Sequence, residues 1–107
     1  MADRARVCLV THPREGAEAF ARGLVERRLA ACVNLLPVTS VYRWEGAVER
    51  GEEQLLVLKT QAERLPELRA VVASDHPYDV PELIVFAVDS GLPAYLSWVA
   101  AECDGGD

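Results

Sequence analysis

The segment from Ala31 to Thr60 constrains the fold of this chain more than any other part of the sequence. Its runs Ala31–Trp44 and Val48–Thr60 predict two strands, and Glu45-Gly46-Ala47 supplies the turn between them. Pro37 lacks the N–H group that a central strand must donate, so the first strand belongs at a sheet edge or carries a bulge. Because strands usually hold about 5–6 residues, we expect a long hairpin whose overhang leaves strand edges that need cover.

Apolar periodicity predicts the remaining elements around this hairpin. Short apolar runs predict strands at Arg6–Thr11 and Glu82–Val88, and helical spacing predicts helices over Arg14–Ala31, Ala62–Ser74 and Gly91–Cys103. The order βαββαβα is that of the ferredoxin-like sandwich, an α+β fold, and we expect a mixed four-stranded sheet with its helices on one side. We predict one domain over residues 1–107, with an ordered core at about 5–103 and a frayed tail over 104–107.

Two strands of this sheet need cover on both faces. Leu55–Leu58 and Leu83–Val88 are apolar at consecutive positions, and side chains along a strand alternate between the two faces. The helices of one subunit cover only one face. The second face and the overhanging hairpin therefore predict contact with further copies of the chain.

Composition and charge exclude several classes of protein. The chain has 107 residues, 11 basic and 17 acidic, and a net charge of −6, so it repels a phosphate backbone and we expect no nucleic-acid partner. No run approaches the roughly 20 apolar residues that cross a bilayer, and Val7–Val10 is too short for a secretory signal. The 3 cysteines are widely spaced and are too few to cross-link a secreted scaffold. We expect a cytoplasmic protein with no membrane partner.

The residues that carry chemistry are few. No phosphate-binding glycine loop, zinc-protease motif or nucleophile elbow occurs, so no motif predicts catalysis. Cys32 lies where a helix turns into a strand, which suits a small buried hydrophobe or a reactive thiol. His76 precedes Pro77-Tyr78 and suits either a hydrogen bond within a turn or a metal ligand, with Asp75 beside it as a second ligand.

Lysine and aromatic residues provide the other candidates. Lys59, the only lysine in the sequence, ends an apolar run, where its ammonium group either reaches solvent or binds an anion. Tyr42 and Trp44 are two residues apart on a strand and share a face, which favours packing against another subunit over stacking on a ligand.

Motifs that follow one another over nearly the whole chain carry a family resemblance. They are Leu29-Ala-Ala-Cys-Val-Asn34, Ser40-Val-Tyr-Arg-Trp-Glu-Gly46, Leu58-Lys-Thr60, His76-Pro-Tyr78 with Pro81-Glu82, and Tyr95-Leu-Ser-Trp98. In this order and spacing they resemble the CutA divalent-cation tolerance family. The resemblance implies a ferredoxin-like subunit in a homotrimer similar to the PII signalling proteins. It also implies a link to tolerance of copper and other divalent cations, and no established catalytic activity.

The resemblance further implies where a ligand binds. Residues that match positions in or near the cleft between subunits are Cys32, Tyr42, Trp44, Lys59, His76, Tyr78, Tyr95 and Trp98. The copper ligands proposed for relatives match Val10, Asp75 and His76 here, so only the histidine is kept and Asp75 offers an oxygen. We expect weak binding of Cu²⁺ or another divalent cation and no obligatory cofactor. Cys8 and His12 share a strand face with Val10, so a metal site rearranged to use these two side chains is an alternative.

The sequence and the resemblance together leave three functions open. The first is a non-enzymatic homotrimer in the response to divalent metal ions. The second is a PII-like module that binds a small anion or metabolite beside Lys59 in the cleft between subunits. The third is an acylphosphatase-like hydrolase. Acylphosphatases use an arginine at the first helix and an asparagine on the second strand, which Arg14 and Asn34 match superficially. However, Thr11-His12-Pro13 lacks the glycine of a phosphate-binding loop.

Overall fold

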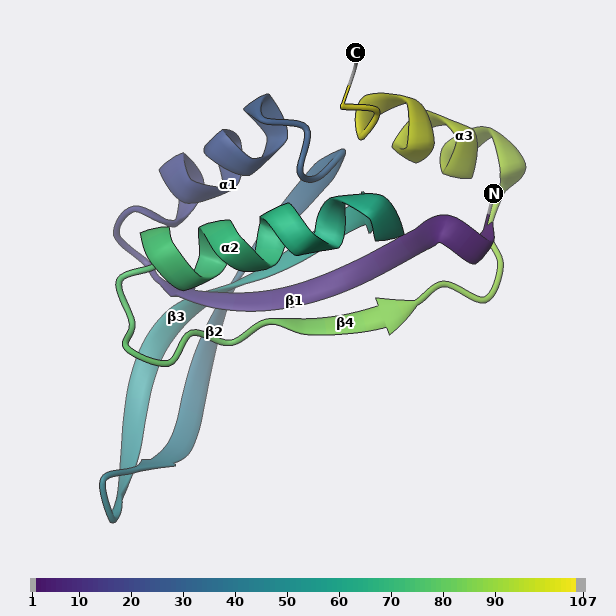
Figure 1. Cartoon of the computed structure of the whole chain (residues 1–107). Coiled ribbons are helices and arrows are strands. Elements are labelled where there is room, and N and C mark those ends of the chain that lie inside the picture. The colour runs from purple at the N-terminus through teal and green to yellow at the C-terminus, as the bar shows by residue number, and fades with distance from the viewer. Residues whose placement is uncertain (1, 106–107) are drawn as a thin grey trace.

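The fold is a four-stranded sheet with helices packed on it (Figure 1), and the computed structural model describes residues 2–105. The strands are β1 (Ala5–Pro13), β2 (Cys32–Trp44), β3 (Ala47–Gln61) and β4 (Ile84–Ala87). The helices are α1 (Ala17–Glu26), α2 (Leu65–Asp75) and α3 (Pro93–Glu102), with short 3-10 helices at Ala2–Arg4 and Ala62–Arg64. This order confirms the predicted α+β, ferredoxin-like plan. Residues 106–107 of the predicted tail lie outside the described part.

The sheet is antiparallel throughout, so the prediction of a mixed sheet was wrong. The strand order is β2-β3-β1-β4, and each of the three neighbouring pairs is antiparallel. Helix α1 links β1 to β2, and α2 links β3 to β4. Each of these crossovers skips one strand position, and the strand that fills the gap runs in the opposite direction. The connections are those of the predicted fold, but no two parallel strands become neighbours.

Several element ends differ from the sequence pattern. Strand β1 continues to Pro13, which pairs with Glu53 at the outer end of the ladder. Helix α1 begins only at Ala17, after Gly16 with φ +86°, and ends at Glu26 before Arg28 with φ +59°. The apolar residues that extended the predicted helix to Ala31 are buried in the connection to β2 instead.

The β2–β3 hairpin matches the prediction closely. Glu45 (φ +50°) and Gly46 (φ +84°) form its two-residue turn, and positive φ at both positions matches the twist of the strands that the turn joins. Within residues 2–105, strand β2 pairs only with β3, so Pro37 lies on an edge strand as expected. Strand β3 pairs with β1 only as far as Glu53, so its segment 47–52 pairs with β2 alone.

Helices α1 and α2 cover one face of the sheet and enclose the core with it (Figure 1). The largest fully buried side chains there include Leu24 from α1, Leu68 from α2, and Val10, Leu56 and Leu58 from the strands. Burial of each leucine side chain stabilises the fold by about 1.5–3 kcal/mol. This layer explains why Cys8, Val10 and His12, which alternate along β1, are buried together.

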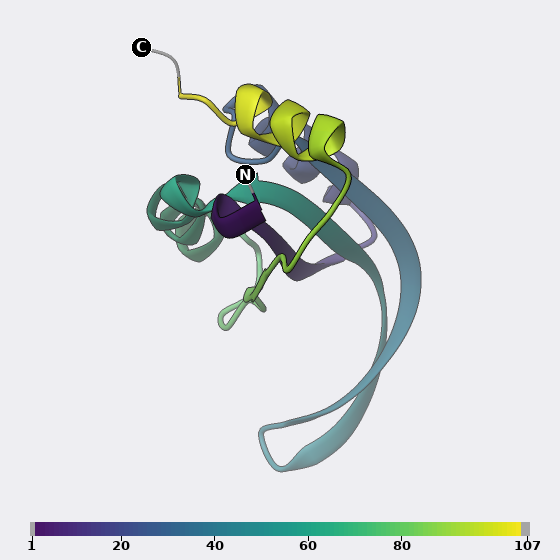
Figure 2. The same ribbon diagram turned by 90° about the vertical axis from the view of Figure 1, so that its right-hand side faces the viewer.

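The opposite face, here called the open face, has no such layer. Ile84 and Phe86 on β4 and Leu36 on β2 are each close to half exposed on it. The outer hairpin, residues 39–52, extends well beyond the other elements (Figure 2). Val41 and Val48 are 70% and 66% exposed there. One chain therefore leaves apolar surface uncovered where the sequence predicts contact with further copies.

Helix α3 closes the end of the sheet opposite the hairpin turn (Figures 1 and 2). Val99 and Cys103 are buried against Ala31, and the Cys103 thiol lies 3.7 Å from the hydroxyl oxygen of Thr60. Thr60 also donates a hydrogen bond of 2.7 Å to the Leu29 carbonyl. None of the helices over residues 2–105 is long and apolar enough to span a bilayer.

Candidate functional site

The predicted site residues on the strands share the open face. Cys32 lies directly opposite Lys59 in the β2–β3 ladder, and Tyr42 lies opposite Glu49. Side chains at directly opposed positions lie on the same face of a sheet, and every second residue of β2 returns to that face. Cys32, Asn34, Tyr42 and Trp44 therefore project from the face that the helices leave open.

Four predicted residues gather near α3, in what we call the Cys32–Lys59 cluster, defined by Cys32, Asn34, Lys59, Tyr95 and Trp98. The Lys59 ammonium group donates a hydrogen bond to the side-chain oxygen of Asn34 and lies 3.9 Å from the Cys32 sulfur. Burial, together with the neighbouring Cys32 thiol, raises the pKa of Tyr95. The Trp98 ring centroid lies 5.6 Å from that of Tyr95. Cys32 is half-buried rather than enclosed, and it has a cation beside it.

The remaining predicted residues lie near the loop that follows α2. His76 is buried, and its Nε2 donates a hydrogen bond of 2.7 Å to the Thr11 carbonyl. Its Nδ1 accepts the main-chain N–H of Tyr78 at 3.1 Å. The ring packs against His12 and Tyr78, with centroids 4.8 Å away in each case, and against Phe20 at 5.7 Å. Burial lowers the pKa of His76.

These contacts define what a metal ion meets at His76. Both ring nitrogens are engaged with main-chain groups, so a metal has to displace one of these hydrogen bonds before imidazole can coordinate it. The Asp75 carboxylate accepts the Ser74 hydroxyl at 2.8 Å and lies 3.6 Å from an Arg27 guanidinium nitrogen. Over residues 2–105 no three His, Cys, Asp or Glu side chains come together as a metal-binding group.

The rearranged site on β1 is buried in the core. Cys8 and Val10 are fully buried, and burial raises the pKa of the Cys8 thiol to about 11. A thiol must lose its proton to bind a metal, so this environment disfavours coordination. The third residue, His12, hydrogen-bonds the Pro13 carbonyl through Nδ1 at 2.8 Å.

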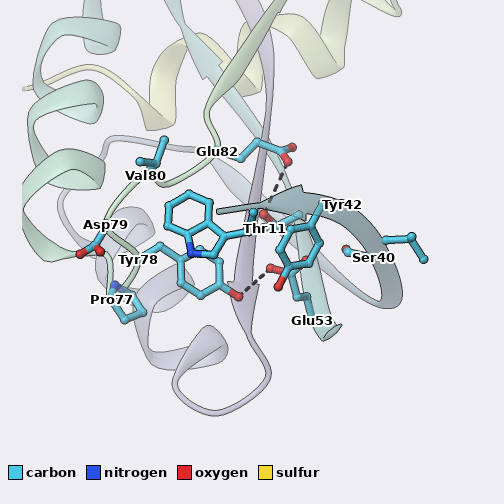
Figure 3. Close-up of a pocket in the computed structure, with 11 residues that line it drawn as sticks. Thr11, Ser40, Tyr42, Glu53, Pro77, Tyr78, Asp79, Val80 and Glu82 are labelled. Atoms are coloured by element: carbon cyan, nitrogen blue, oxygen red, sulfur yellow. Dashed lines mark hydrogen bonds between the residues drawn. The ribbon is translucent and has the colours of Figure 1, made fainter. Parts of the chain in front are cut away.

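A pocket of about 680 Å³ lies between the outer hairpin and the loop after α2 (Figure 3). Tyr42 and Trp44 line it from β2, Glu53 from β3, Tyr78 from the loop and Glu82 from the approach to β4. The Tyr78 hydroxyl donates a hydrogen bond of 2.6 Å to the Glu53 carboxylate. The Thr11 hydroxyl lies 3.5 Å from a carboxylate oxygen of Glu82. We call this the hairpin pocket.

Sequence reasoning missed the two glutamates of the hairpin pocket. Glu53 stands in the polar run Glu49–Gln54, which is typical of a solvated strand, yet it is only 8% exposed. Its burial depends on the loop that carries Tyr78 across the sheet, a contact between residues 25 positions apart. For Glu82, the sequence does offer a sign of a functional role, because this residue directly follows Pro81 within one of the motifs described above.

The eight predicted residues thus form two groups in a single chain. Glu53, at the hairpin pocket, and Lys59, in the Cys32–Lys59 cluster, are six positions apart on β3, or about 20 Å at about 3.3 Å per residue. Arg14 and Asn34 are also separated, because Arg14 pairs with Glu52 at 2.8 Å while Asn34 contacts Lys59 on the open face. The paired arginine and asparagine of an acylphosphatase site are not formed.

Comparison with known proteins identifies one family. The sequence profile described as "CutA1 divalent ion tolerance protein" matches residues 6–102. A mouse relative, "Protein CutA", is 50% identical over 92 residues, which cover 84% of this chain and 52% of the relative. The "Divalent-cation tolerance protein CutA" of Thermus thermophilus is 45% identical over 95 residues, which cover 87% of this chain and 92% of the relative. The chain spans about half the length of the mouse and human relatives.

Solved structures agree with the sequence comparison. The crystal structure of CutA from Xylella fastidiosa matches with a TM-score of 0.90 at 40% identity, covering 94% of this chain and 99% of that one. A structure described as "PII-like protein CutA" from Nostoc sp. PCC 7120 matches with a TM-score of 0.89 at 36% identity, again covering 94% and 99%. By sequence and by fold, the chain belongs to the CutA1 divalent ion tolerance protein family.

Proposed function

We propose that this chain acts as a non-enzymatic homotrimer in the cellular response to divalent metal ions. Family membership over residues 6–102 supports the link to divalent cations. The main support for the homotrimer is the apolar surface that one chain leaves uncovered, above all on the outer hairpin. Val41 and Val48 project from one face of the hairpin, and Tyr42 and Trp44 project from the other.

A second copy is the partner that this surface fits best. The uncovered residues include aliphatic and aromatic side chains on both faces of the outer hairpin, on β4 and on α3. Exposed apolar side chains in this number favour contact with another protein. An unpaired strand edge in the same region calls for the same cover. The number three follows from the family resemblance, and the cytoplasm is the compartment that we propose on the spacing of the cysteines.

For the metal itself we propose weak binding of Cu²⁺ at His76, with Asp75 as an oxygen ligand. Neutral imidazole and carboxylate oxygens suit the divalent ion, whereas Cu⁺ prefers sulfur. Coordination has to compete with the Thr11 carbonyl or the Tyr78 N–H for a ring nitrogen, and this competition is a physical reason for low affinity. Copper is here a bound cargo or signal, and no cofactor is required for folding.

Titration calorimetry with CuSO₄ tests this metal site. The wild type and Asp79→Ala, a control that removes a carboxylate of the same loop, should bind Cu²⁺ alike, and His76→Ala should lose the binding. Equal binding by wild type and His76→Ala would exclude His76 as the ligand. Loss of tight Cu⁺ binding in Cys8→Ser but not in His76→Ala would relocate the site to β1.

The second candidate is a PII-like module that binds a small anion. The observation that favours it is the Lys59 ammonium group, held at the surface by Asn34 beside Cys32 and Tyr95, and one solved relative is itself described as PII-like. Thermal unfolding in citrate and in inorganic phosphate tests this candidate. Stabilisation that persists in Arg50→Gln but is lost in Lys59→Gln would support anion binding. No stabilisation of the wild type would exclude these two anions as ligands.

A further inference from the structure

The hairpin pocket does not stay open in the homotrimer proposed above. Tyr42 and Trp44 line it from the outer hairpin, and the same hairpin carries the exposed apolar side chains that we place under a second copy. The copy that covers the hairpin therefore also encloses the pocket. The group that fills the pocket has to come from that copy or fit beneath it.

This enclosure covers two carboxylates that have no cation in their own chain. Glu53 is 8% exposed and accepts only the neutral Tyr78 hydroxyl, and Glu82 is half-buried beside the Thr11 hydroxyl. Neither glutamate takes part in an ion pair formed by residues 2–105, and no lysine, arginine or histidine lines the pocket. Removing water from these carboxylates is unfavourable unless a positive charge arrives with the covering copy.

Few cations of the chain are free to supply that charge. Within residues 2–105, Arg6 donates to main-chain carbonyls, Lys59 donates to Asn34, and most other arginines pair with carboxylates. Arg43 and Arg69 have no such partner. Arg69 lies on the exposed side of α2, in the helix layer, whereas Arg43 is exposed on the outer hairpin. Arg43 is therefore the free cation that lies on the surface between copies.

Arg43 does not reach the pocket of its own chain. It stands between Tyr42 and Trp44 on β2, and successive side chains of a strand point to opposite faces. Since Tyr42 and Trp44 line the pocket, Arg43 projects from the other side of the hairpin, together with Val48, which lies opposite it in the ladder. A guanidinium group from Arg43 enters the pocket only if it belongs to another copy.

The two sides of the outer hairpin are complementary in charge. The side that bears Tyr42 also bears Glu49, directly opposite in the ladder, and leads to Glu53. The other side bears Val48 and Arg43. A cyclic trimer joins two different surfaces of neighbouring copies, so each chain must offer two surfaces that fit one another. The acidic and aromatic side of one hairpin and the basic side of the next meet this requirement.

We infer that, in the proposed homotrimer on which this pairing depends, Arg43 of each chain enters the hairpin pocket of the next chain and pairs with Glu53 and Glu82. The planar guanidinium group bonds two carboxylates at once and stacks on aromatic rings such as those of Tyr42 and Trp44. The volume of about 680 Å³ leaves room for this long side chain. The pocket is thus a subunit contact that one chain leaves incomplete.

The electrostatics of Glu82 agree with this pairing. Burial and the nearby Glu53 charge raise the pKa of Glu82 in a single chain, which is the response of a carboxyl group that lacks a cation. A divalent metal ion is a weaker candidate for this charge, because it favours three or more converging ligands and no such group occurs over residues 2–105. An arginine needs only the two glutamates.

Carbodiimide cross-linking of Arg43→Lys tests the pairing. The reagent joins a lysine amine to a carboxylate that it contacts, and the only lysine of the wild type is Lys59, which Asn34 holds in the Cys32–Lys59 cluster. We expect covalent dimers and trimers on denaturing gels, in which tandem mass spectrometry finds position 43 linked to Glu53 or Glu82. Arg69→Lys, which places the same amine on the helix layer, should give no link to either glutamate.

Exchange of the two charges provides an independent test. Arg43→Glu and Glu82→Arg should each lower the melting temperature by about 4 °C or more, because each brings like charges together between chains. The double variant should recover at least half of the loss, since every contact between copies then holds the exchanged pair. Arg69→Glu is the control and should leave the melting temperature unchanged.

The possible outcomes separate this pairing from the homotrimer itself. A trimer in which position 43 forms no link to Glu53 or Glu82 overturns the pairing and leaves the homotrimer intact. The same holds if Arg43→Glu melts like the wild type, or if the losses of the two reversals simply add in the double variant. A protein that is monomeric by native mass spectrometry overturns both.

Discussion

His76 Nε2 donates a hydrogen bond to the Thr11 carbonyl at 2.7 Å and so fastens the loop after α2 to β1. The other ring nitrogen accepts the N–H of Tyr78 at 3.1 Å. A ring that donates at one nitrogen and accepts at the other is neutral. The same contacts that position Tyr78 at the hairpin pocket therefore require His76 to stay unprotonated.

Acidification should destabilise the fold through His76. Burial lowers its pKa below the ordinary value of 6.5, and the nearby positive form of His12 acts in the same direction. Since the unfolded chain then binds more protons, the stabilisation is fully present above pH 6.5 and is lost as pH falls from there towards the folded pKa. Thermal unfolding across this range should show a smaller decrease in His76→Gln than in wild type. Identical pH profiles for the two proteins would contradict this assignment.

Substitution of the α2 core residue should destabilise the subunit strongly. Leu68 is fully buried between the helices and the sheet. Leu68→Ala should lower the free energy of unfolding by about 2–5 kcal/mol, through lost burial and the cavity left behind. The neighbouring substitution Glu67→Ala, on the exposed side of α2, should change it by about 0.5 kcal/mol or less. Urea unfolding measures both, and similar values for the two would refute the described packing.

Charge on the outer hairpin should break the assembly. Val41 is 70% exposed in one chain, and we place it under a neighbouring subunit. Val41→Glu would bury a carboxylate there, so light scattering should detect dissociated chains. Ala19→Glu, on the exposed side of α1, should leave the mass unchanged. An intact assembly in Val41→Glu would mean that this part of the hairpin faces solvent.

The protein should not hydrolyse acyl phosphates. Arg14 is engaged with Glu52, and Asn34 with Lys59, so the two residues that correspond to an acylphosphatase pair do not meet. Incubation with acetyl phosphate should give hydrolysis at the background rate. Turnover above background that disappears in Arg14→Ala would establish the hydrolase function.

Local patterns predicted most of the fold. The apolar run Leu55–Leu58 and the Glu45-Gly46 turn depend only on neighbours in sequence, so the hairpin and the element order could be predicted. The antiparallel sheet was missed because element order alone does not state which strand fills the gap left by a crossover. Glu53 was missed because Tyr78, 25 positions away, buries it. The separation of Cys32 and Lys59 from Tyr78 likewise depends on their positions along the sheet.

Native mass spectrometry of the protein as purified from its host tests the proposed homotrimer, because it reports the number of chains and any retained metal together. We predict an assembly of three times 11.7 kDa, the mass of one chain. A stable monomer at micromolar concentration would contradict the homotrimer, since the open face and outer hairpin would then have no second copy to cover them.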